Sequence, residues 1–447
     1  MQENRKTTPE SSQFREFIGS GWAPHNDGTP AARDVATFAA ARRERLSQLF
    51  PGERLIIEAG PLLVRSNDTD FPFRAHSDFT YLTGWGSESE PDSVLMFEPT
   101  ADGHDVCLYF RAPAGRDSDE FYANPQIGEF WIGRRPSLRV VATALGLATR
   151  DLTELVPETM DSALAQRVAQ ELAEMRLVKD TWEIEQLRAA VASTARGFSD
   201  IARVLGAIAG NERGERLVEG AFASRARLEG NGVGYDTIAA SGAHACILHW
   251  TRNDGTVSAG DLILIDAGVE LDSYYTADIT RTLPVNGTFS PIQRKVYEGV
   301  RAAADAAFAI VKPGLTFRDV HAEAMRVIAE LTAEWGLLPV SASEALEPEN
   351  QHHRRYMVHG TSHHLGLDVH DCAQARKEMY LDGTLTAGMV FTIEPGLYFH
   401  PDDLTVPEEF RGIGVRIEDN IVVTETGAEN LSVGIPRTAD EIESWLG

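Results

Sequence analysis

The sequence predicts a mixed α/β (α+β) fold made of two domains. The chain has 447 residues, enough for two domains, and 43% of them are hydrophobic. In the first part of the chain, short apolar runs with the length of strands alternate with helical patterns, which is typical of an α/β domain. In the second part, longer amphipathic helices interrupt the strand-like runs, which predicts a sheet with helices packed on it.

The first domain is expected at residues 33–173, after a polar arm at residues 1–32. The arm is rich in Gly, Pro, Ser and Asn, so we expect it to be flexible or draped over the protein. A helical pattern starts after Asp34, a residue type that caps helices, and continues to Phe50. The strand-like runs that follow are 55–57, 62–64, 94–97 and 106–110, and further helices are expected at 140–146 and 161–172.

The second domain is expected at residues 174–447, because a long amphipathic helix capped by Asp180 or Thr181 begins near its start. Ser290 followed by Pro291 is the pattern of an N-cap and a first helical residue. Further helices are expected at 214–229, 290–309 and 317–335. Strands are expected at 235–240, 262–266, 278–283, 389–394 and 415–423.

The chain is strongly acidic, and its charge excludes some classes of partner. It carries 41 Lys and Arg against 67 Asp and Glu, a formal net charge of −26. A surface of this sign repels phosphate backbones and anionic lipids, so we expect no nucleic-acid and no membrane partner. The sequence has no long apolar run and no signal-peptide core at its start. Its three cysteines are far apart, which predicts free thiols in the cytoplasm.

Two aspartates frame the stretch around which the second domain is organised. The apolar run Leu262–Ile265 predicts a buried strand, and it ends at Asp266. Asp278 stands directly before the next strand-like run, 279–283. A strand that ends at one acid and turns back into a strand beginning with another can bring both carboxylates to one point. Turn or cap chemistry would explain either aspartate alone, whereas a buried pair needs a shared proton, an arginine or a metal ion.

Further acids and histidines occupy comparable positions later in the chain. Glu394 ends the apolar run 390–393, and period-two alternation after Val415 puts Arg416 and Glu418 on one face of a strand. Taken singly, each Glu would be an exposed strand residue and each histidine a structural one. Four acids at the ends or polar faces of apolar strands, with a cluster of histidines, instead indicate a two-metal carboxylate site. The histidines are His249, His359, His363, His364 and His370.

Ligand chemistry restricts the metal that such a site prefers. Four carboxylates with one imidazole form a hard, oxygen-rich set, which favours Mn²⁺ and also accepts Co²⁺, Zn²⁺ or Fe²⁺. Two divalent cations would offset up to four carboxylate charges, which explains how several acids can share one pocket. The residues alone do not decide whether His363 or its neighbour His364 completes the set.

At these positions the sequence resembles the pita-bread metallopeptidases, and within them the aminopeptidase P (Xaa-Pro aminopeptidase) branch. The resemblance is carried by LIDAG, ADITRT, HGTSHHLGLDVHD, TIEPGLY and VRIEDN, and by RSNDTDFPFRAHSDFTYLTGW in the first domain. It covers nearly the whole chain beyond the arm, although the loop between Asp266 and Asp278 is slightly longer than usual. It implies a creatinase-like N-terminal domain and a catalytic domain whose curved, mainly antiparallel sheet is covered by helices.

The resemblance also implies which residues bind two divalent metal ions, of which Mn²⁺ is the most favoured. Asp278 and Glu418 would bridge the two ions. Asp266 would bind one of them, and His363 together with Glu394 would hold the other.

Other residues are implied to contact the substrate or to support the ligands. Arg416 and Tyr398 would orient a ligand, Glu394 would carry a proton, and the histidines would donate hydrogen bonds to the peptide. Trp131 would reach into the site of a neighbouring subunit, and His364 would be a bystander. The implied catalytic residues are His249, His359, His370, Glu394 and Arg416, and the implied substrate-binding residues are Asp68, Trp131 and Tyr398.

The implied reaction releases the N-terminal residue from peptides with proline in the second position, by attack of a metal-bridging hydroxide. Such a bond needs a dedicated site, because the proline nitrogen carries no hydrogen and the ring fixes φ. We expect peptide substrates with N-terminal Xaa-Pro and a homo-oligomer, either a dimer or a tetramer. One alternative is an Xaa-Pro dipeptidase with the same metals. The other is a non-catalytic pita-bread binding protein, which the intact ligand set disfavours.

Overall fold

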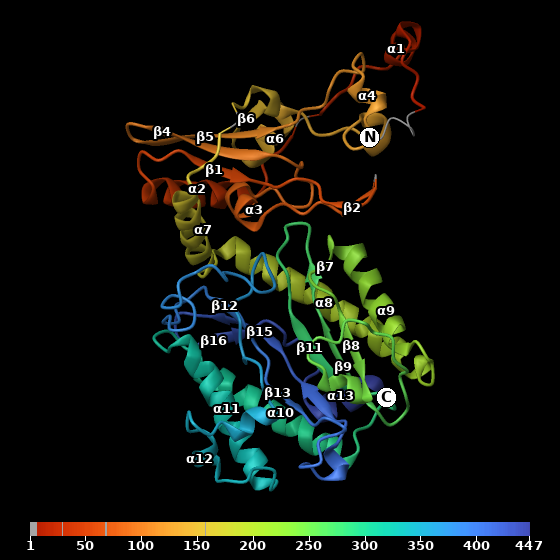
Figure 1. Ribbon diagram of the computed structural model, residues 1–447, viewed down its shortest axis with the longest axis vertical. Coiled ribbons are helices and arrows are strands. Elements are labelled where there is room, and N and C mark those ends of the chain that lie inside the picture. The colour runs from red at the N-terminus through yellow and green to blue at the C-terminus, as the bar shows by residue number, and fades with distance from the viewer. Residues whose placement is uncertain (1–6, 29, 68, 157) are drawn as a thin grey trace. The chain divides into compact units, whose positions relative to one another are not determined.

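The protein forms two compact units in the computed structural model (Figure 1), which describes residues 7–447 except 29, 68 and 157. The first unit ends at Val168 and the second comprises Ala169–Gly447. This division falls inside helix α7 (Ser162–Arg176), slightly before the predicted boundary. Because α7 is continuous across both positions, the boundary after residue 173 stays a prediction.

The N-terminal segment contains a helix that its composition did not predict. Helix α1 (Ser12–Gly19) begins after Ser11, whose side chain accepts a hydrogen bond from the amide of Phe14 at 3.2 Å. The ring of Phe14 packs edge-on against Tyr122, with ring centroids 5.4 Å apart. This part of the segment is therefore draped against other residues of the first unit.

A four-stranded sheet forms the core of the first unit. The strands of this unit are β1 (Leu55–Glu58), β2 (Val64–Ser66), β3 (Thr69–Asp70), β4 (Val94–Thr100), β5 (Gly103–Phe110) and β6 (Ala148–Asp151). The sheet has the order β1-β4-β5-β6, and it is antiparallel except for the parallel pair β5 and β6. The apolar runs at 55–57, 94–97 and 106–110 lie in this sheet, whereas the run 62–64 contributes only its last residue to the exposed strand β2.

Five α-helices lie between α1 and α7 in the described part of the first unit. They are α2 (Val35–Leu49), α3 (Ser77–Thr83), α4 (Glu120–Ala123), α5 (Glu129–Ile132) and α6 (Leu138–Leu145). Of these helices, α2, α3 and α6 contact the sheet. Arg42 and Arg43 of α2 are buried, and they donate to the carbonyls of Tyr81 and Leu82 at 3.0 and 2.8 Å. These carbonyls end α3, where a positive charge stabilises the helix. Asp34 lies at the N-cap of α2, but its side chain makes no capping hydrogen bond with the described residues.

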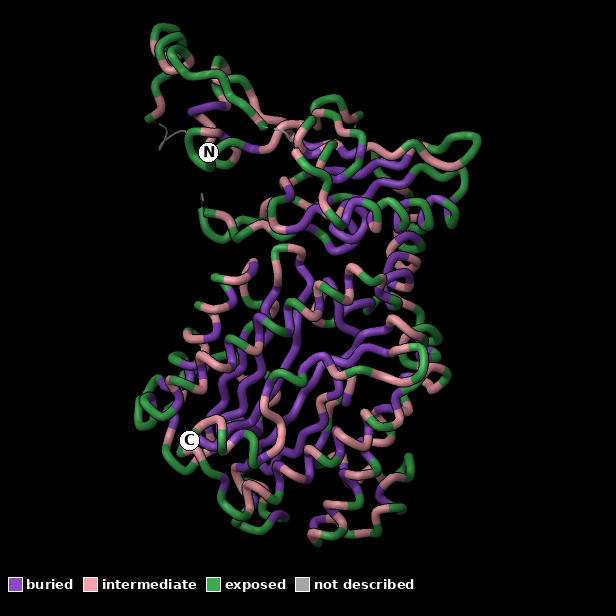
Figure 2. The backbone as a smooth tube through the Cα atoms, turned by 180° about the vertical axis from the view of Figure 1, so that it is seen from behind, coloured by how far each residue is buried: buried purple, intermediate pink, exposed green. Residues whose placement is uncertain are grey.

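The second unit contains short antiparallel ladders, as the predicted fold class requires. Its strands are β7 (Gly232–Val233), β8 (Ile238–Ser241), β9 (Leu262–Ala267), β10 (Val269–Glu270), β11 (Ile279–Pro284), β12 (Val390–Ile393), β13 (Gly396–Tyr398), β14 (Gly414–Arg416), β15 (Asp419–Val423) and β16 (Ala428–Asn430). The ladders have the orders β11-β9-β8, β12-β15-β16, β13-β14 and β10-β7. All of these strands are buried along their whole length except β7 and β16. Figure 2 draws the buried stretches of the chain in purple.

The single strand predicted at 415–423 is wrong, because the chain forms two strands there. Strand β14 pairs with β13, whereas β15 pairs with β12, so the chain leaves one ladder for another at Ile417 and Glu418. The segment that pairs with these two strands changes ladder in the same way, between β12 and β13, at Glu394 and Pro395. Apolar residues continue across the break, so the hydrophobic pattern does not reveal it.

Long helices cover the strands of the second unit (Figure 1), and short helices follow them along the chain. The long helices are α8 (Thr181–Ile208), α9 (Gly214–Glu229), α10 (Pro291–Ile310) and α11 (Phe317–Glu334), and the short helices are α12 (Ala342–Ala345) and α13 (Ala439–Leu446). Asp180 forms a capping box with Glu183 at the start of α8, and Ser290 forms one with Gln293 at α10, which confirms both predicted helix starts. Among the described residues, no helix has the length and apolarity needed to cross a membrane.

Candidate active site

Two antiparallel strands bring Asp266 and Asp278 together, as predicted. In the ladder of β9 and β11, Asp266 pairs with Thr280, so Asp278 lies just before the first residue of β11. Both carboxylates are almost fully buried, with 8% and 4% of the residue exposed. The apolar residues of β9 bury the strand on both faces, which forces the acid at its end into the interior.

Tyr235 lies between these two carboxylates and was not predicted. Its hydroxyl is 2.7 Å from Asp266 Oδ1 and also contacts Asp278 Oδ1. One hydroxyl proton can serve only one of these acceptors at a time. Burial, followed by the charges of the neighbouring acids, raises the pKa of Tyr235 well above its usual range, so the hydroxyl stays protonated. Tyr235 begins an ordinary strand-like run, and nothing in that pattern distinguishes it.

The change of ladder at residues 394–395 and 417–418 turns two glutamates into the same pocket. Glu418 donates its amide to the carbonyl of Thr280 at 3.1 Å, and Glu394 donates its amide to the carbonyl of Thr361 at 2.8 Å. Each backbone is therefore bonded outside its own ladder at the residue that carries the acid. The break in the predicted strand is thus the feature that brings Glu394 and Glu418 to one point.

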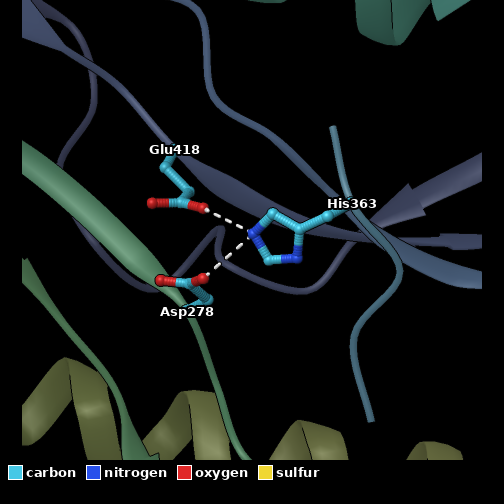
Figure 3. A group of neighbouring side chains, drawn as sticks. All are labelled: Asp278, His363 and Glu418. Carbon is cyan, nitrogen blue, oxygen red and sulfur yellow. Dashed lines mark ion pairs between the residues drawn. The ribbon is translucent and has the colours of Figure 1, made fainter. Parts of the chain in front are cut away.

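His363 contacts three of the acids, as Figure 3 shows for two of them. Its Nε2 is 3.2 Å from Asp278 Oδ2, 3.5 Å from Glu394 Oε1 and 4.0 Å from Glu418 Oε1. Burial opposes a charge on this ring, but the hydrogen bond to Asp278 and the nearby carboxylates outweigh it and raise the pKa of His363 to about 9. If Nε2 carried a lone pair, that lone pair and the carboxylate oxygens would repel each other. The arrangement therefore requires a proton on Nε2 or a cation between Nε2 and the oxygens.

His364 has a different environment, which distinguishes the two adjacent histidines. Its ring stacks on Phe317 with centroids 4.5 Å apart, and only 1% of the residue is exposed. Neither ring nitrogen has a hydrogen-bond partner among the described residues. Burial lowers the pKa of His364 to about 3, so the neutral ring packs as an aromatic residue.

The pocket holds more negative charge than its one arginine can balance. Burial raises the pKa of Glu394 to about 7, and burial together with the charge of Asp278 raises that of Glu418 well above the usual range. Arg416 Nη2 lies 2.5 Å from Asp266 Oδ2 and balances one carboxylate. In the described part of the chain, Glu418 Oε1 has no hydrogen-bond partner.

These residues fit divalent metal ions. Ligand atoms of Asp278, His363 and Glu418 lie within 4.8 Å of one another, close enough to bind one cation. Among the described residues, Glu418 Oε1 has no hydrogen-bond partner, and the pKa of Glu418 is raised by burial and by the charge of Asp278, so a cation beside this carboxylate would stabilise its charged form. The donors are mainly oxygen, which is the preference of hard divalent cations.

Three further histidines line the same cavity, whose volume is about 590 Å³. His359 Nε2 lies 2.7 Å from the hydroxyl of Tyr398, which in turn accepts from Arg416 at 3.2 Å. Burial, followed by the charge of Arg416, lowers the pKa of His359 to about 3, so its ring is neutral. The His370 ring stands edge-on to that of His363, with centroids 4.4 Å apart. His249 lies on the loop that follows β8.

A buried ion pair supports the loop that carries His370. The next residue, Asp371, is 1% exposed and accepts from Lys179 Nζ at 3.1 Å. Arg176 Nε lies 3.3 Å from its other oxygen. Lys179 has no exposed side-chain surface, and it also donates to the carbonyl of Arg176. A buried carboxylate between two cations fixes the backbone beside His370.

The structure does not test the two site residues that were predicted in the first domain. Trp131 belongs to α5 in the first unit, where its indole N–H donates to the carbonyl of Tyr122 at 2.7 Å. Asp68 lies outside the described residues. The roles assigned to both therefore stay predictions.

The chain is similar to known sequences along nearly its whole length. The sequence model of metallopeptidase family M24 matches residues 185–425, and that of the aminopeptidase P N-terminal domain matches residues 39–172. Xaa-Pro aminopeptidase 1 of Streptomyces coelicolor is 49% identical and covers 98% of this chain and 92% of its own length. The Xaa-Pro aminopeptidase of Escherichia coli is 33% identical, with coverages of 92% and 97%.

Solved structures extend this similarity to the fold. The aminopeptidase PepP of Pseudomonas aeruginosa has a TM-score of 0.80 at 31% identity and covers 93% of this chain and 99% of its own. Zinc-substituted aminopeptidase P of E. coli in complex with product has a TM-score of 0.78 at 31% identity, with coverages of 93% and 99%. These likenesses confirm the predicted N-terminal domain and pita-bread catalytic domain. The chain therefore belongs to metallopeptidase family M24, in its aminopeptidase P branch.

Proposed function

We propose that this protein is a metal-dependent aminopeptidase that releases the N-terminal residue from peptides whose second residue is proline. The observation that carries the proposal is the buried cluster of Asp278, His363 and Glu418 in a cavity lined by three more histidines. Relatives named Xaa-Pro aminopeptidases support the choice of substrate. A cavity of about 590 Å³ is large enough for a short peptide.

Two divalent metal ions would complete the site, and we propose Mn²⁺ because the donors are mainly oxygen. Asp278 and Glu418 would be shared by both ions, Asp266 would bind one, and His363 with Glu394 would bind the other. When bound, such ions act as Lewis acids that activate water and polarise a carbonyl at neutral pH. An E. coli relative is known in a zinc-substituted form, which supports a site that accepts several divalent metals.

The protein's own side chains supply orientation and proton transfer. The guanidinium of Arg416 donates to the carboxylate of Asp266 and also to the hydroxyl of Tyr398, which holds the guanidinium in place. Glu394 carries a proton to the proline nitrogen, because an amide nitrogen leaves as a neutral amine only after it has been protonated. His249 and His370 donate hydrogen bonds to the peptide and to the oxygen on which negative charge develops.

Matched peptides test the proposal. Protein loaded with Mn²⁺ should cleave Ala-Pro-Ala, should cleave Ala-Pro more slowly, and should leave Ala-Ala-Ala intact. Removal of metal with a chelator, followed by dialysis, should abolish cleavage, and added Mn²⁺ should restore it. Cleavage of Ala-Pro alone would favour a dipeptidase, whereas no cleavage with any of the four metals named above would favour a non-catalytic binding protein.

We further propose that the protein is a dimer or a tetramer. Helix α5 exposes three consecutive apolar side chains, with 59% of Phe130, 57% of Trp131 and 55% of Ile132 accessible. Contiguous exposed apolar residues favour a protein contact. Light scattering should detect the oligomer at assay concentration, and a fully active monomer would contradict it.

We also propose a cytoplasmic location. Cys107, Cys246 and Cys372 are free thiols in the structure, which is typical of a reducing compartment. Fractionation of native cells tests this, and recovery of the protein among secreted proteins would contradict it.

A further inference from the structure

His249 lies on a long connection between β8 and β9 that has little regular structure. We call residues 242–257 the His249 loop; it begins with the 3-10 helix η3 (Gly242–Cys246). Its residues Leu248, His249 and Thr251 line the cavity. A catalytic donor on such a loop needs support from outside, because loops are more mobile than strands.

Glu215, in the first turn of α9, bonds to both ends of this loop. The residue is fully buried. Its Oε1 accepts from the amide of Ser241 at 2.8 Å and lies 2.8 Å from His244 Nδ1. Its Oε2 accepts from the indole N–H of Trp250 at 2.8 Å and from the amide of Gly255 at 2.6 Å. Four contacts from two oxygens therefore close the loop around one carboxylate.

The packing around Glu215 is tight, which indicates a specific arrangement. The rings of His244 and Trp250 stack with centroids 3.8 Å apart. A Cβ on Gly255 would lie 2.8 Å from Glu215 Cδ and 2.7 Å from the His244 ring, so only glycine fits there. Helix α9 packs beside β8 (Figure 1), so the carboxylate holds the loop against a buried element.

A second contact one turn along α9 extends this support. Asn253 is fully buried with a φ of 47°, a left-handed conformation that asparagine tolerates. Its side chain accepts from the amide of Ala239 at 2.9 Å and donates to Glu219 Oε2 at 3.1 Å. The far end of the loop is thus bonded to β8 and to α9.

We infer that Glu215 is a positioning residue for the proposed peptidase reaction: it holds the loop that presents His249 to the peptide. The inference rests on the proposed function. Glu215 itself is not among the residues that line the cavity, so its effect must pass through the loop. Its negative charge is suited to the task, because three of its four partners are N–H groups that can only donate.

The variant Glu215→Gln tests this role with almost no change in shape. However the amide is turned, its NH₂ group faces at least one of the three N–H donors, so the loop loses contacts. We expect kcat/KM for Ala-Pro-Ala to fall about 10- to 100-fold, mainly in kcat, because a small misplacement of a catalytic group has this effect. In a His249→Ala background, the same change should lower kcat/KM less than about twofold, because the loop then has no donor to position.

Limited proteolysis gives a readout that does not depend on activity. Arg252 has 73% of its side chain exposed, whereas the following Asn253 is buried, so trypsin can cut after Arg252 only when the loop leaves α9. Trypsin should cut there faster in Glu215→Gln than in the wild type. The matched control is Glu229→Gln, the same substitution at the other end of α9, which should leave both kcat/KM and cleavage after Arg252 unchanged.

A milder variant covers the case in which Glu215→Gln does not fold. Trp250→Phe keeps an aromatic ring against His244, although a smaller one, and lacks the indole N–H that donates to Glu215. It should therefore raise the rate of cleavage after Arg252 and lower kcat/KM, both by a smaller factor than Glu215→Gln. Unchanged proteolysis and unchanged kcat/KM in the folded variants, or losses that add fully to that of His249→Ala, would overturn the inference. A wild-type protein that cleaves no Xaa-Pro peptide would overturn the proposed function instead. The proteolysis experiment would then still test whether Glu215 holds the His249 loop against α9.

Discussion

The carboxylates and the histidines of the pocket are held in place in different ways. Asp266 lies in a buried strand, and Asp278, Glu394 and Glu418 lie directly beside buried strands, where hydrogen bonds from each backbone amide to neighbouring segments fix the chain. His249 and His370 lie on irregular loops, and each loop is held by a buried charged residue, Glu215 or Asp371, that does not line the cavity.

This difference matches the two tasks that the site performs. Several acids can be kept close together only by a rigid frame, because they repel one another until a cation binds. Groups that contact a peptide must fit a substrate that enters and leaves, and loops are suited to this task. Buried strands and their ends therefore carry the four carboxylates, which we call the metal half together with the one loop ligand His363, and the loops that carry the other histidines form the peptide half.

The largest expected effect follows from a change in the metal half. Asp278→Asn removes one charge from the cluster that would be shared by both ions, and activity on Ala-Pro-Ala should fall at least about 10³-fold, since metal catalysis supplies several kcal/mol. Elemental analysis should show a loss of bound metal in parallel. The control is Asp272→Asn, in the same connection between β9 and β11 but exposed, which should keep both. A fully active Asp278→Asn enzyme would refute the division into two halves.

A change in the buried ion pair that supports the loop carrying His370 should lower the stability of the fold. Lys179→Met leaves Asp371 buried with only Arg176 as a counter-charge, and breaking such a pair costs about 3 kcal/mol. The melting temperature should fall, and turnover should fall with it because Asp371 adjoins His370. Lys312→Met changes an exposed lysine and should alter neither. A Lys179→Met protein as stable as the wild type would show that this ion pair does not fix the loop.

The smallest expected effect concerns an ion pair far from both halves. Hydrogen bonds from Arg196 lower the pKa of Glu229 from 4.5 to about 2. A lowered pKa stabilises the fold above pH 4.5, and this contribution is lost as the pH falls toward 2. Because Arg196 is half exposed, Glu229→Gln should cost only about 1 kcal/mol at pH 7. The difference in melting temperature between the two proteins should shrink below pH 4.5, and a difference that grows there would contradict the assignment.

The sequence predicted that the four acids lie close together, but it did not predict how the strands beside Glu418 are paired. Asp266 and Asp278 follow or precede solid apolar runs, and such runs are readable as buried strands. The break at Ile417 and Glu418 was missed because a change of hydrogen-bonding partner leaves no mark on an apolar pattern. The same limit applies to Tyr235, which lies between β7 and β8 and contacts two acids that are 31 and 43 residues away in the sequence.

The histidine loops were less predictable, because a loop has no periodicity to read. Without the resemblance, His363 and His364 were equivalent; the structure separates them by packing one among acids and the other on Phe317. Glu215 and Lys179 looked like ordinary residues at the starts of helices. Their partners lie 26 to 40 and 192 residues away in the sequence, so only the fold reveals the contacts.

The division into two halves is tested most directly by His370→Ala, with metal content, melting temperature and turnover measured on one preparation. The ring lies beside His363 but is not one of the proposed ligands, and removal of such a hydrogen-bond donor costs about 10²- to 10³-fold in rate. We predict that turnover of Ala-Pro-Ala falls by this factor while metal content and melting temperature stay those of the wild type. Loss of metal or of stability in parallel with turnover would contradict the division, because His370 would then belong to the frame that holds the metals.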